Sequence, residues 1–244
     1  MPHRKLIARL QAVVGLSEQD QAKLARMPYK LKNLDNGAFV ARQGERPRSS
    51  TVVMSGFLCR QKVISDRNQI SSFYLAGDMP DLHTLHLPVM DHELCSVGSS
   101  TIASVSHDYL REVMDASPRI MHAFWRETLI HGAIYREWVE NLGGRQAIGR
   151  IAHLLCELAT RLELIGLLDN GSFHLPFTQQ NIADACGLSA VHVNRTLQQL
   201  RSEHLVEWQH HTVRLLDRTA LEDVAEFDRA YLHTLESVRS SIST

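Results

Sequence analysis

The sequence lacks the patterns that define several large classes of protein. It has no apolar run near the roughly 20 residues that a membrane-spanning helix needs. Its 4 cysteines are scattered and form no C-x-x-C pair, which argues against a disulfide framework, a zinc finger and an iron–sulfur site. The G-x-x-x-x-G-K-[ST] phosphate loop, the G-x-S-x-G elbow and the H-E-x-x-H helix are also absent. We therefore expect a cytoplasmic protein without a membrane anchor that is not an enzyme.

An excess of charge of one sign is missing as well. Lys and Arg number 26 against 27 Asp and Glu, so the formal net charge is −1. The strongly basic composition that is typical of many nucleic-acid-binding domains is thus not seen over the whole chain. Hydrophobic residues make up 44% of the 244 residues, which is enough for a packed core and argues against disorder.

The periodicity of the apolar residues divides the chain into helical and β-rich parts. Up to about Lys32 the apolar residues recur at helical spacing. From about Gly37 to His107 short β-like runs are broken by turn residues, which predicts a small antiparallel barrel or sandwich. The polar segment "SDRNQ" between Ile64 and Ile70 predicts a hairpin turn.

A long helix is predicted after this β-rich part, beginning at Ser117-Pro118 and running to about residue 142. Gly143-Gly144 then breaks the pattern. Residues on this helix recur at the 3,4 spacing of a coiled-coil seam, which we interpret as a dimer interface: Met121, Phe124, Thr128, His131, Tyr135, Trp138 and Leu142. Three further apolar residues widen the stripe: Trp125, Leu129 and Val139. The alternative interpretation is a core helix that covers the barrel.

The stretch "FTQQNIADACGLSAVHVNRTLQQLRSEHLVEW" contains two short helical patterns that meet at a glycine. Thr178 and Ser189 are predicted to cap the two helices. Ala183 gives a small side chain where they cross, and Gly187 permits a left-handed turn between them. The following "HLVEWQHHTVRLLD" alternates apolar and polar residues, which predicts a two-stranded wing. Together these features favour a winged helix-turn-helix over a plain packed pair of helices.

The order of these parts resembles the Crp/Fnr family of bacterial transcription regulators, over about residues 10 to 216. "RQGERPRSSTVVMSG", with Gly44 and Gly56, and "LAGD" are similar to the turns of the family's barrel, and "ENLGGRQAIGRIAHLL", with Arg150-Ile151-Ala152, is similar to its interdomain junction. The resemblance implies an α+β fold with an N-terminal cyclic-nucleotide-binding-like antiparallel β-barrel (jelly roll), a long dimerisation helix and a C-terminal winged helix-turn-helix. The corresponding division is 1–117, 118–142, 143–218 and a C-terminal helical extension at 219–244, where the apolar positions fit one amphipathic helix.

The function implied by the resemblance is sequence-specific DNA binding by a homodimer under the control of an unidentified signal at the barrel. The expected partners are a palindromic double-stranded operator and, for an activator, RNA polymerase. Arg195 matches the family's guanine-reading arginine, whereas Val191 replaces its glutamate. The expected DNA contacts are Thr178, Gln179, Gln180, Ser189, Val191, His192, Asn194, Arg195, Gln198, Gln199 and His210.

A second class of function stays open because residues 176–218 contain as many acidic residues as arginines. This balance is unusual for a DNA-binding surface. The alternative is a ligand- or metal-sensing protein that works through protein partners with weak or no DNA binding. Under the first interpretation, Arg145, Arg150 and Arg161 are expected to add to the attraction for phosphates.

The effector cannot be assigned from the sequence, although two known ones are not expected. The family's cyclic-nucleotide cassette uses a glutamate and an arginine, and its two motifs fall here on Asp81-Leu82 and on His92-Glu93-Leu94. No arginine is left to pair with the cyclic phosphate, so cyclic AMP is not expected. No cysteine precedes Cys59, so the iron–sulfur cluster of the family's oxygen sensors is not expected either.

The segment "PDLHTLHLPVMDHEL" occupies the place of that cassette and is rich in possible metal ligands. These are Asp81, His83, His86, Asp91 and His92. We interpret the segment as a polar loop that covers the barrel mouth, and we expect no metal. A metal or haem site is the alternative.

Overall fold

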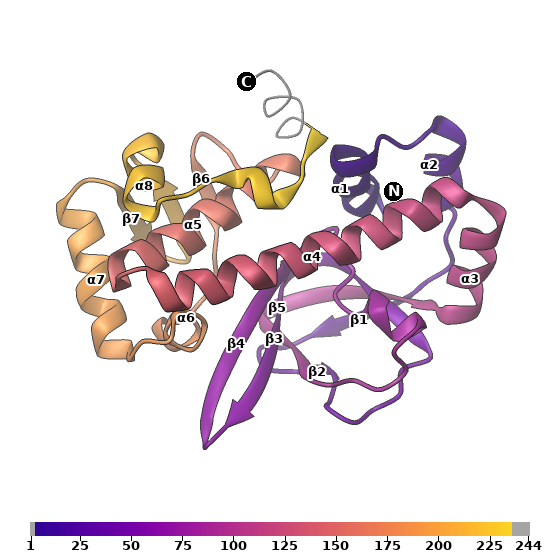
Figure 1. Cartoon of the computed structure of the whole chain (residues 1–244), viewed down its shortest axis with the longest axis horizontal. Helices are drawn as coiled ribbons and strands as arrows, with labels where there is room; N and C mark the ends of the chain where they lie inside the picture. The colour runs from indigo at the N-terminus through magenta and orange to yellow at the C-terminus, as the bar shows by residue number, and fades with distance from the viewer. Residues whose placement is uncertain (1–2, 236–244) are drawn as a thin grey trace.

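The computed structural model describes residues 3–235, in which a long helix crosses a β-sheet and ends beside a helical C-terminal part (Figure 1). Two short helices, α1 (Arg4–Val14) and α2 (Glu18–Ala25), precede the sheet. No helix in the described part of the chain is both long and apolar enough to cross a membrane.

The sheet has five antiparallel strands in the order β1-β5-β3-β4, with β2 also paired to β5. Their bounds are β1 (Lys30–Leu34), β2 (Phe39–Ala41), β3 (Ser49–Ile64), β4 (Arg67–Leu75) and β5 (Glu93–Ser106). The predicted hairpin is confirmed, because Ile64 pairs with Arg67 across a turn in which Ser65 and Asp66 have φ of 48° and 60°. The prediction of helix up to Lys32 is wrong at its end. Only Leu34 of β1 is buried, so buried and exposed residues do not alternate along this strand. It is a strand because it pairs with β5.

The long helix α4 (Pro118–Gly144) follows α3 (His107–Ala116) directly. Ser117 caps it by accepting a hydrogen bond from the Ile120 amide, and Pro118 occupies the first turn as predicted. A short 3-10 helix, η1 (Leu82–Leu85), lies in the loop between β4 and β5.

The predicted dimer seam on α4 is wrong for part of its residues. Phe124, His131 and Trp138 are buried within the chain's own core, where a second subunit cannot reach them. Met121 of the predicted seam is exposed, and it forms an exposed apolar stripe with the three residues that were predicted to widen the seam: Trp125, Leu129 and Val139. The helix has two adjacent apolar stripes, and the 3,4 spacing alone does not tell which of them faces the protein's own sheet.

The C-terminal part begins with α5 (Ala147–Leu164), which folds back along α4 (Figure 1). It continues with α6 (Gln179–Cys186) and α7 (Ala190–Ser202), between which Gly187 has a φ of 63°. A three-stranded sheet in the order β6-β8-β7 completes it: β6 (Ser172–His174), β7 (Val206–Gln209) and β8 (Thr212–Leu215). The predicted two-stranded wing thus gains a third strand, β6, for which the sequence analysis predicted no strand.

The single helix predicted after the wing is interrupted. The structure has α8 (Arg218–Ala225) and the 3-10 turn η2 (Arg229–Leu232), separated at Glu226, whose φ is 48°. The Tyr231 hydroxyl donates a hydrogen bond to Glu157 of α5 at 3.0 Å, so this segment packs on α5 and α4. Residues 236–244 of the predicted extension lie outside the described residues.

A buried network of charges joins the sheet to α5. Arg161 Nη2 lies 2.6 Å from a carboxylate oxygen of Asp78, at the turn after β4, and its Nη1 lies 2.9 Å from Glu157. Arg9 of α1 pairs with Glu127 of α4 at 3.3 Å. All five side chains are at most 2% exposed. Burial alone would raise the pKa of Glu127, but Arg9 and His131 lower it to about 2.

Candidate DNA-binding surface and loop pocket

Helix α7 buries one face and presents the other to solvent. Val193, Leu197 and Leu200 pack inward against the C-terminal core. Ser189 caps the helix by accepting a hydrogen bond from the His192 amide at 3.2 Å, as predicted. This cap fixes the start of the helix directly after Ser189.

The outward face of α7 carries Val191, Arg195 and Gln198, which recur at helical spacing. Val191 is 82% exposed. Over residues 3–235, no hydrogen bond or ion pair holds the Arg195 side chain. Its guanidinium is therefore free to reach a partner outside the chain, and its planar set of donors matches the acceptor edge of guanine.

The other predicted DNA contacts are positioned by α6, α7 and the wing. Thr178 forms a capping box with Asn181, so its hydroxyl is engaged at the start of α6. Gln180 donates to Asp184 at 2.6 Å, and Gln199 donates to Glu203 at 2.9 Å. Both glutamines are exposed, but each must break a local bond to contact DNA. Of the remaining predicted contacts, Gln179 and His210 are exposed, whereas His192 and Asn194 are half-buried.

The three arginines expected to attract phosphates are engaged inside the protein instead. Arg161 belongs to the buried charge network. Arg145 donates to Glu137 at 3.0 Å and to the Ala225 carbonyl at 2.8 Å. Arg150 donates to the Cys186 carbonyl at the end of α6 at 3.2 Å. That expectation is therefore corrected: these side chains hold the helices together.

The helix-turn-helix also contacts the β3–β4 hairpin, which the sequence analysis did not foresee. Asn68 and Gln69 of the hairpin donate to the Asp184 carboxylate and to the Asp184 carbonyl, at 3.1 and 2.8 Å. The Phe177 ring lies 5.2 Å from that of Phe57 and 4.1 Å from that of Phe73, measured between centroids. The β3–β4 hairpin is thus in direct contact with α6, the helix that precedes α7.

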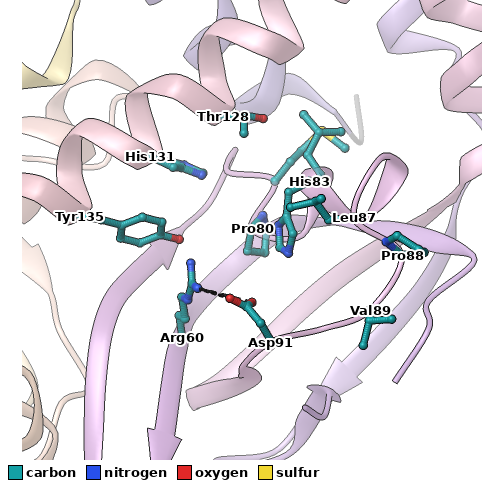
Figure 2. A pocket seen from close by; sticks show the side chains of 12 residues that line it. Arg60, Pro80, His83, Leu87, Pro88, Val89, Asp91, Thr128, His131 and Tyr135 are labelled. Atoms are coloured by element: carbon teal, nitrogen blue, oxygen red, sulfur yellow. Dashed lines mark hydrogen bonds and ion pairs between the residues drawn. The ribbon is translucent and has the colours of Figure 1, made fainter. Parts of the chain in front are cut away.

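A cavity of about 510 Å³ lies between α4, β3 and the loop that follows β4 (Figure 2). Arg60 reaches into it from β3, with its guanidinium 3.2 Å from Asp91 and 4.8 Å from the centre of the Tyr135 ring on α4. Tyr135 in turn shares a hydrogen bond with Tyr74 of β4. The lining residues are Arg60, Met79, Pro80, Leu82, His83, Leu87, Pro88, Val89, Asp91, Thr128, His131 and Tyr135.

Two outcomes follow for the sequence predictions. Thr128, His131 and Tyr135, which were assigned to the dimer seam, line this cavity. Arg60 was missed as a site residue, although a charged residue inside the apolar run "VVMSGFLCRQ" was a usable signal. The long side chain of Arg60 places a cation in the cavity, although the loop that lines the cavity contains no Lys or Arg.

Only three of the five potential metal ligands in the loop after β4 lie close together. His83, Asp91 and His92 each bring one potential ligand atom within 4.8 Å of the others. Asp81 is turned away, because it accepts bonds from the Thr51 amide and hydroxyl at 2.6 and 2.8 Å. Burial raises its pKa to about 6. His86 is exposed and lies outside the group.

Comparison with known proteins gives a consistent result. The Crp-like helix-turn-helix domain matches residues 149–224. A protein of Rhizobium leguminosarum bv. viciae named "Probable transcriptional activator" is 25% identical over 80% of both chains. Transcriptional activator protein FnrA of Stutzerimonas stutzeri is 24% identical over 85% of both chains. The structure of FixK2 from Bradyrhizobium japonicum superposes with a TM-score of 0.74 at 22% identity, over 81% of this chain and 98% of that one.

Proposed function

The chain is a DNA-binding transcription regulator of the Crp/Fnr family, with the α+β fold of that family and not of an enzyme, and from this premise we propose how it works. Two copies bind a near-palindromic operator through their α7 helices. The occupant of the cavity beside α4 sets how the two α7 helices are placed.

The outward face of α7 is the observation that carries this proposal. Arg195 is unpaired within residues 3–235, and Val191 beside it is 82% exposed. A guanidinium in the major groove pairs with the O6 and N7 acceptors of guanine, whereas valine suits a thymine methyl group. We therefore expect a guanine in each half-site, with half-sites about one helical turn apart.

The exposed stripe of α4 supports a homodimer. Met121, Trp125, Leu129 and Val139 are 48%, 64%, 57% and 71% exposed. Large apolar side chains grouped in this way mark an interaction surface. A two-fold axis across α4 would place the same stripe of each copy against the other, which makes the contact self-complementary.

The cavity supports control by a bound signal because it joins the loop to α4. Arg60 contacts Asp91 on one side and Tyr135 of α4 on the other. Cyclic AMP fits this arrangement poorly, since Leu82 occupies a cassette position and Arg60 is neutralised by Asp91. The four buried cysteines are also too dispersed in sequence to favour an iron–sulfur cluster.

The names of the relatives support a role as an activator. Both FnrA and the Rhizobium leguminosarum protein are named activators, so contact with RNA polymerase at the promoter is part of the proposal. Chromosomal DNA as the target implies a cytoplasmic location.

Selection of binding sites from random duplexes tests the reading of DNA. Arg195→Ala should lose the preference for guanine, with a cost of about 1–3 kcal/mol at that position. Ser189→Ala should weaken binding to all sequences alike, because Ser189 lies where the backbone is contacted. Arg111→Ala is the matched control, since Arg111 is 51% exposed on α3, far along the chain from the helix-turn-helix. An Arg195→Ala protein that enriches the same guanine as the wild type contradicts the proposal.

The alternative, a sensor that acts only through protein partners, makes a different prediction. DNA binding by this regulator should fall steeply as salt rises, because phosphate contacts release counterions. If the wild type shows no binding to any selected or random duplex at low salt, the partner-only function is favoured.

A further inference from the structure

Two of the four cysteines are far apart in the sequence but lie side by side in the sheet. Cys59 of β3 is directly opposite Cys95 of β5 in the antiparallel ladder, and their Sγ atoms are 3.3 Å apart. Both are free thiols, 2% and 4% exposed. The Cα atoms of directly opposite residues in such a ladder are about 4.5–5.5 Å apart, which is within the range that a disulfide spans. The backbone therefore holds the two thiols where a bond between them can form.

The pair lies on the face of the sheet that packs against the helix-turn-helix. Phe73 of β4 is opposite Cys59, and Phe57 precedes Cys59 by two residues, so both rings share its face. The ring of Phe177, directly before α6, packs on both of these rings. All of these side chains and that of Cys95 belong to one core cluster. The two thiols are thus part of the core that joins the sheet to the DNA-binding part.

Polar contacts also lead from this pair to α6. Gln61 Oε1 lies 3.7 Å from Cys59 Sγ and accepts a hydrogen bond from Asn68 at 3.0 Å. Asn68 also donates to the Asp184 carboxylate of α6 at 3.1 Å. Only two side chains therefore separate the Cys59 sulfur from the helix-turn-helix.

We propose that Cys59 and Cys95 are a reversible oxidation site, at which hydrogen peroxide converts the two thiols into an intrachain disulfide. The Cys95 sulfur attacks one peroxide oxygen, the O–O bond breaks, and the other oxygen leaves as water with the Cys95 proton, which gives a sulfenic acid. The Cys59 sulfur then attacks the Cys95 sulfur. The S–S bond forms, the S–O bond breaks, and the hydroxyl leaves as a second water with the Cys59 proton. The two sulfurs supply the two electrons that the peroxide takes up, and a small dithiol reverses the reaction by exchange.

The four thiols are not equivalent. The hydrogen bond from Cys59 lowers the pKa of Cys95 in spite of its burial, and the same contact raises the pKa of Cys59. Because the thiolate is the nucleophile, Cys95 attacks first and Cys59 resolves the sulfenic acid. Burial raises the pKa of Cys156 and of Cys186 to about 12, and within residues 3–235 neither of them bonds to a second thiol. Cysteine pairs that oxidise transiently are the kind of disulfide found in reducing compartments.

Mass spectrometry of the full-length protein after treatment with hydrogen peroxide tests the proposal. Cleavage by trypsin places Cys59 in the peptide 49–60 and Cys95 in the peptide 68–111. We expect the two peptides to be joined by a disulfide, with the loss of two hydrogens, and to separate when dithiothreitol is added. The proposal is overturned if no joined peptide forms, or if it forms only in protein that has first been unfolded in urea. The test involves no DNA, so the oxidation site and operator binding can fail separately.

Two variants distinguish the pair from buried thiols in general. Cys59→Ala should abolish the joined peptide and leave Cys95 as a sulfenic acid that dimedone traps. Cys186→Ala is the matched control and should leave the linkage unchanged, because Cys186 is 2% exposed, like Cys59, but has no thiol partner within residues 3–235.

The rates in the wild type add a test that does not depend on how the variants fold. Cys59 and Cys95 should lose their free thiols at least about 10-fold faster than Cys156, because only this pair offers a thiolate with a second thiol beside it. Alkylation after timed exposure to peroxide measures these rates, and circular dichroism checks that each variant folds. Equal rates at all four cysteines contradict the assignment.

Discussion

The two faces of α4 are organised in opposite ways. The face toward the sheet buries charged and polar side chains, Glu127 and His131 among them. The face toward solvent exposes Trp125, Leu129 and Val139. The inner face also buries Phe124, Ile134 and Trp138, so both faces carry large apolar side chains and hydrophobicity alone does not tell them apart. What decides the inner face is pairing: Glu127 meets Arg9 at 3.3 Å and His131 at 3.2 Å, so its charge is compensated after leaving water.

The difference separates two kinds of stabilisation. A buried ion pair holds one arrangement of α1, α4 and α5, and it is costly to break because the remaining charge stays buried. An exposed apolar stripe stabilises nothing within one chain and contributes only when a second surface covers it. The inner face should therefore govern folding, and the outer face should govern assembly.

The largest expected effect is on the inner side of this comparison. Arg161→Ala removes the only arginine that contacts both Asp78 and Glu157 within the described residues. We expect a loss of about 3–5 kcal/mol in the free energy of unfolding, measured by urea denaturation at fixed protein concentration.

Arg119→Ala is the control for this loss, because the Arg119 side chain is 58% exposed and its ion pair with Asp20 spans 3.7 Å. Its effect should stay below about 1 kcal/mol. A similar small loss for Arg161→Ala would mean that the buried network does not hold the two parts together.

On the outer side, Leu129→Glu should weaken the proposed homodimer. Each dimer would lose two buried leucines, and at about 1.5–3 kcal/mol each the dissociation constant should rise at least about 100-fold. Leu31→Glu provides the comparison, since Leu31 is exposed to a similar degree, 60% against 57%, but lies on β1. Analytical ultracentrifugation distinguishes them, and a Leu129→Glu protein with wild-type dimer affinity would exclude this stripe as the interface.

A smaller effect is expected from pH. The pKa of Glu127 is lowered to about 2 in the folded protein, so its contribution to stability is present above its ordinary pKa near 4.5 and is lost as pH falls toward 2. The stability difference between wild type and Glu127→Gln should shrink by about 1–2 kcal/mol between neutral pH and about pH 3.5. A difference that stays constant over this range would show that Glu127 is not held ionised by Arg9 and His131.

The parts of the fold governed by local chemistry could be predicted from the sequence. Thr178 and Ser189 cap their helices, and Gly187 takes the left-handed turn, because each role depends on one side chain and its immediate backbone. The β3–β4 hairpin was found for the same reason.

The parts governed by tertiary pairing could not be predicted. Strand β1 has no alternation of its own and exists through its ladder with β5. Arg145 and Arg150 were expected at the surface, yet carbonyl groups from distant helices engage them. The assignment of the α4 faces failed because the partner of Glu127, Arg9, lies 118 residues away in the sequence.

The buried bridge between Asp78 and Arg161 also limits how modular this regulator can be. Asp78 belongs to the N-terminal half, for which we propose a sensing role, and Arg161 to the DNA-binding half, and both are almost completely inaccessible to water. Exchanging either half for that of a relative would preserve each fold but separate the pair, unless the donor carries the matching charge. Chimeras, and natural recombination between paralogues, should give a stable protein only when Asp78 and Arg161 are kept or exchanged together. The two halves of this protein have therefore to be inherited as one unit.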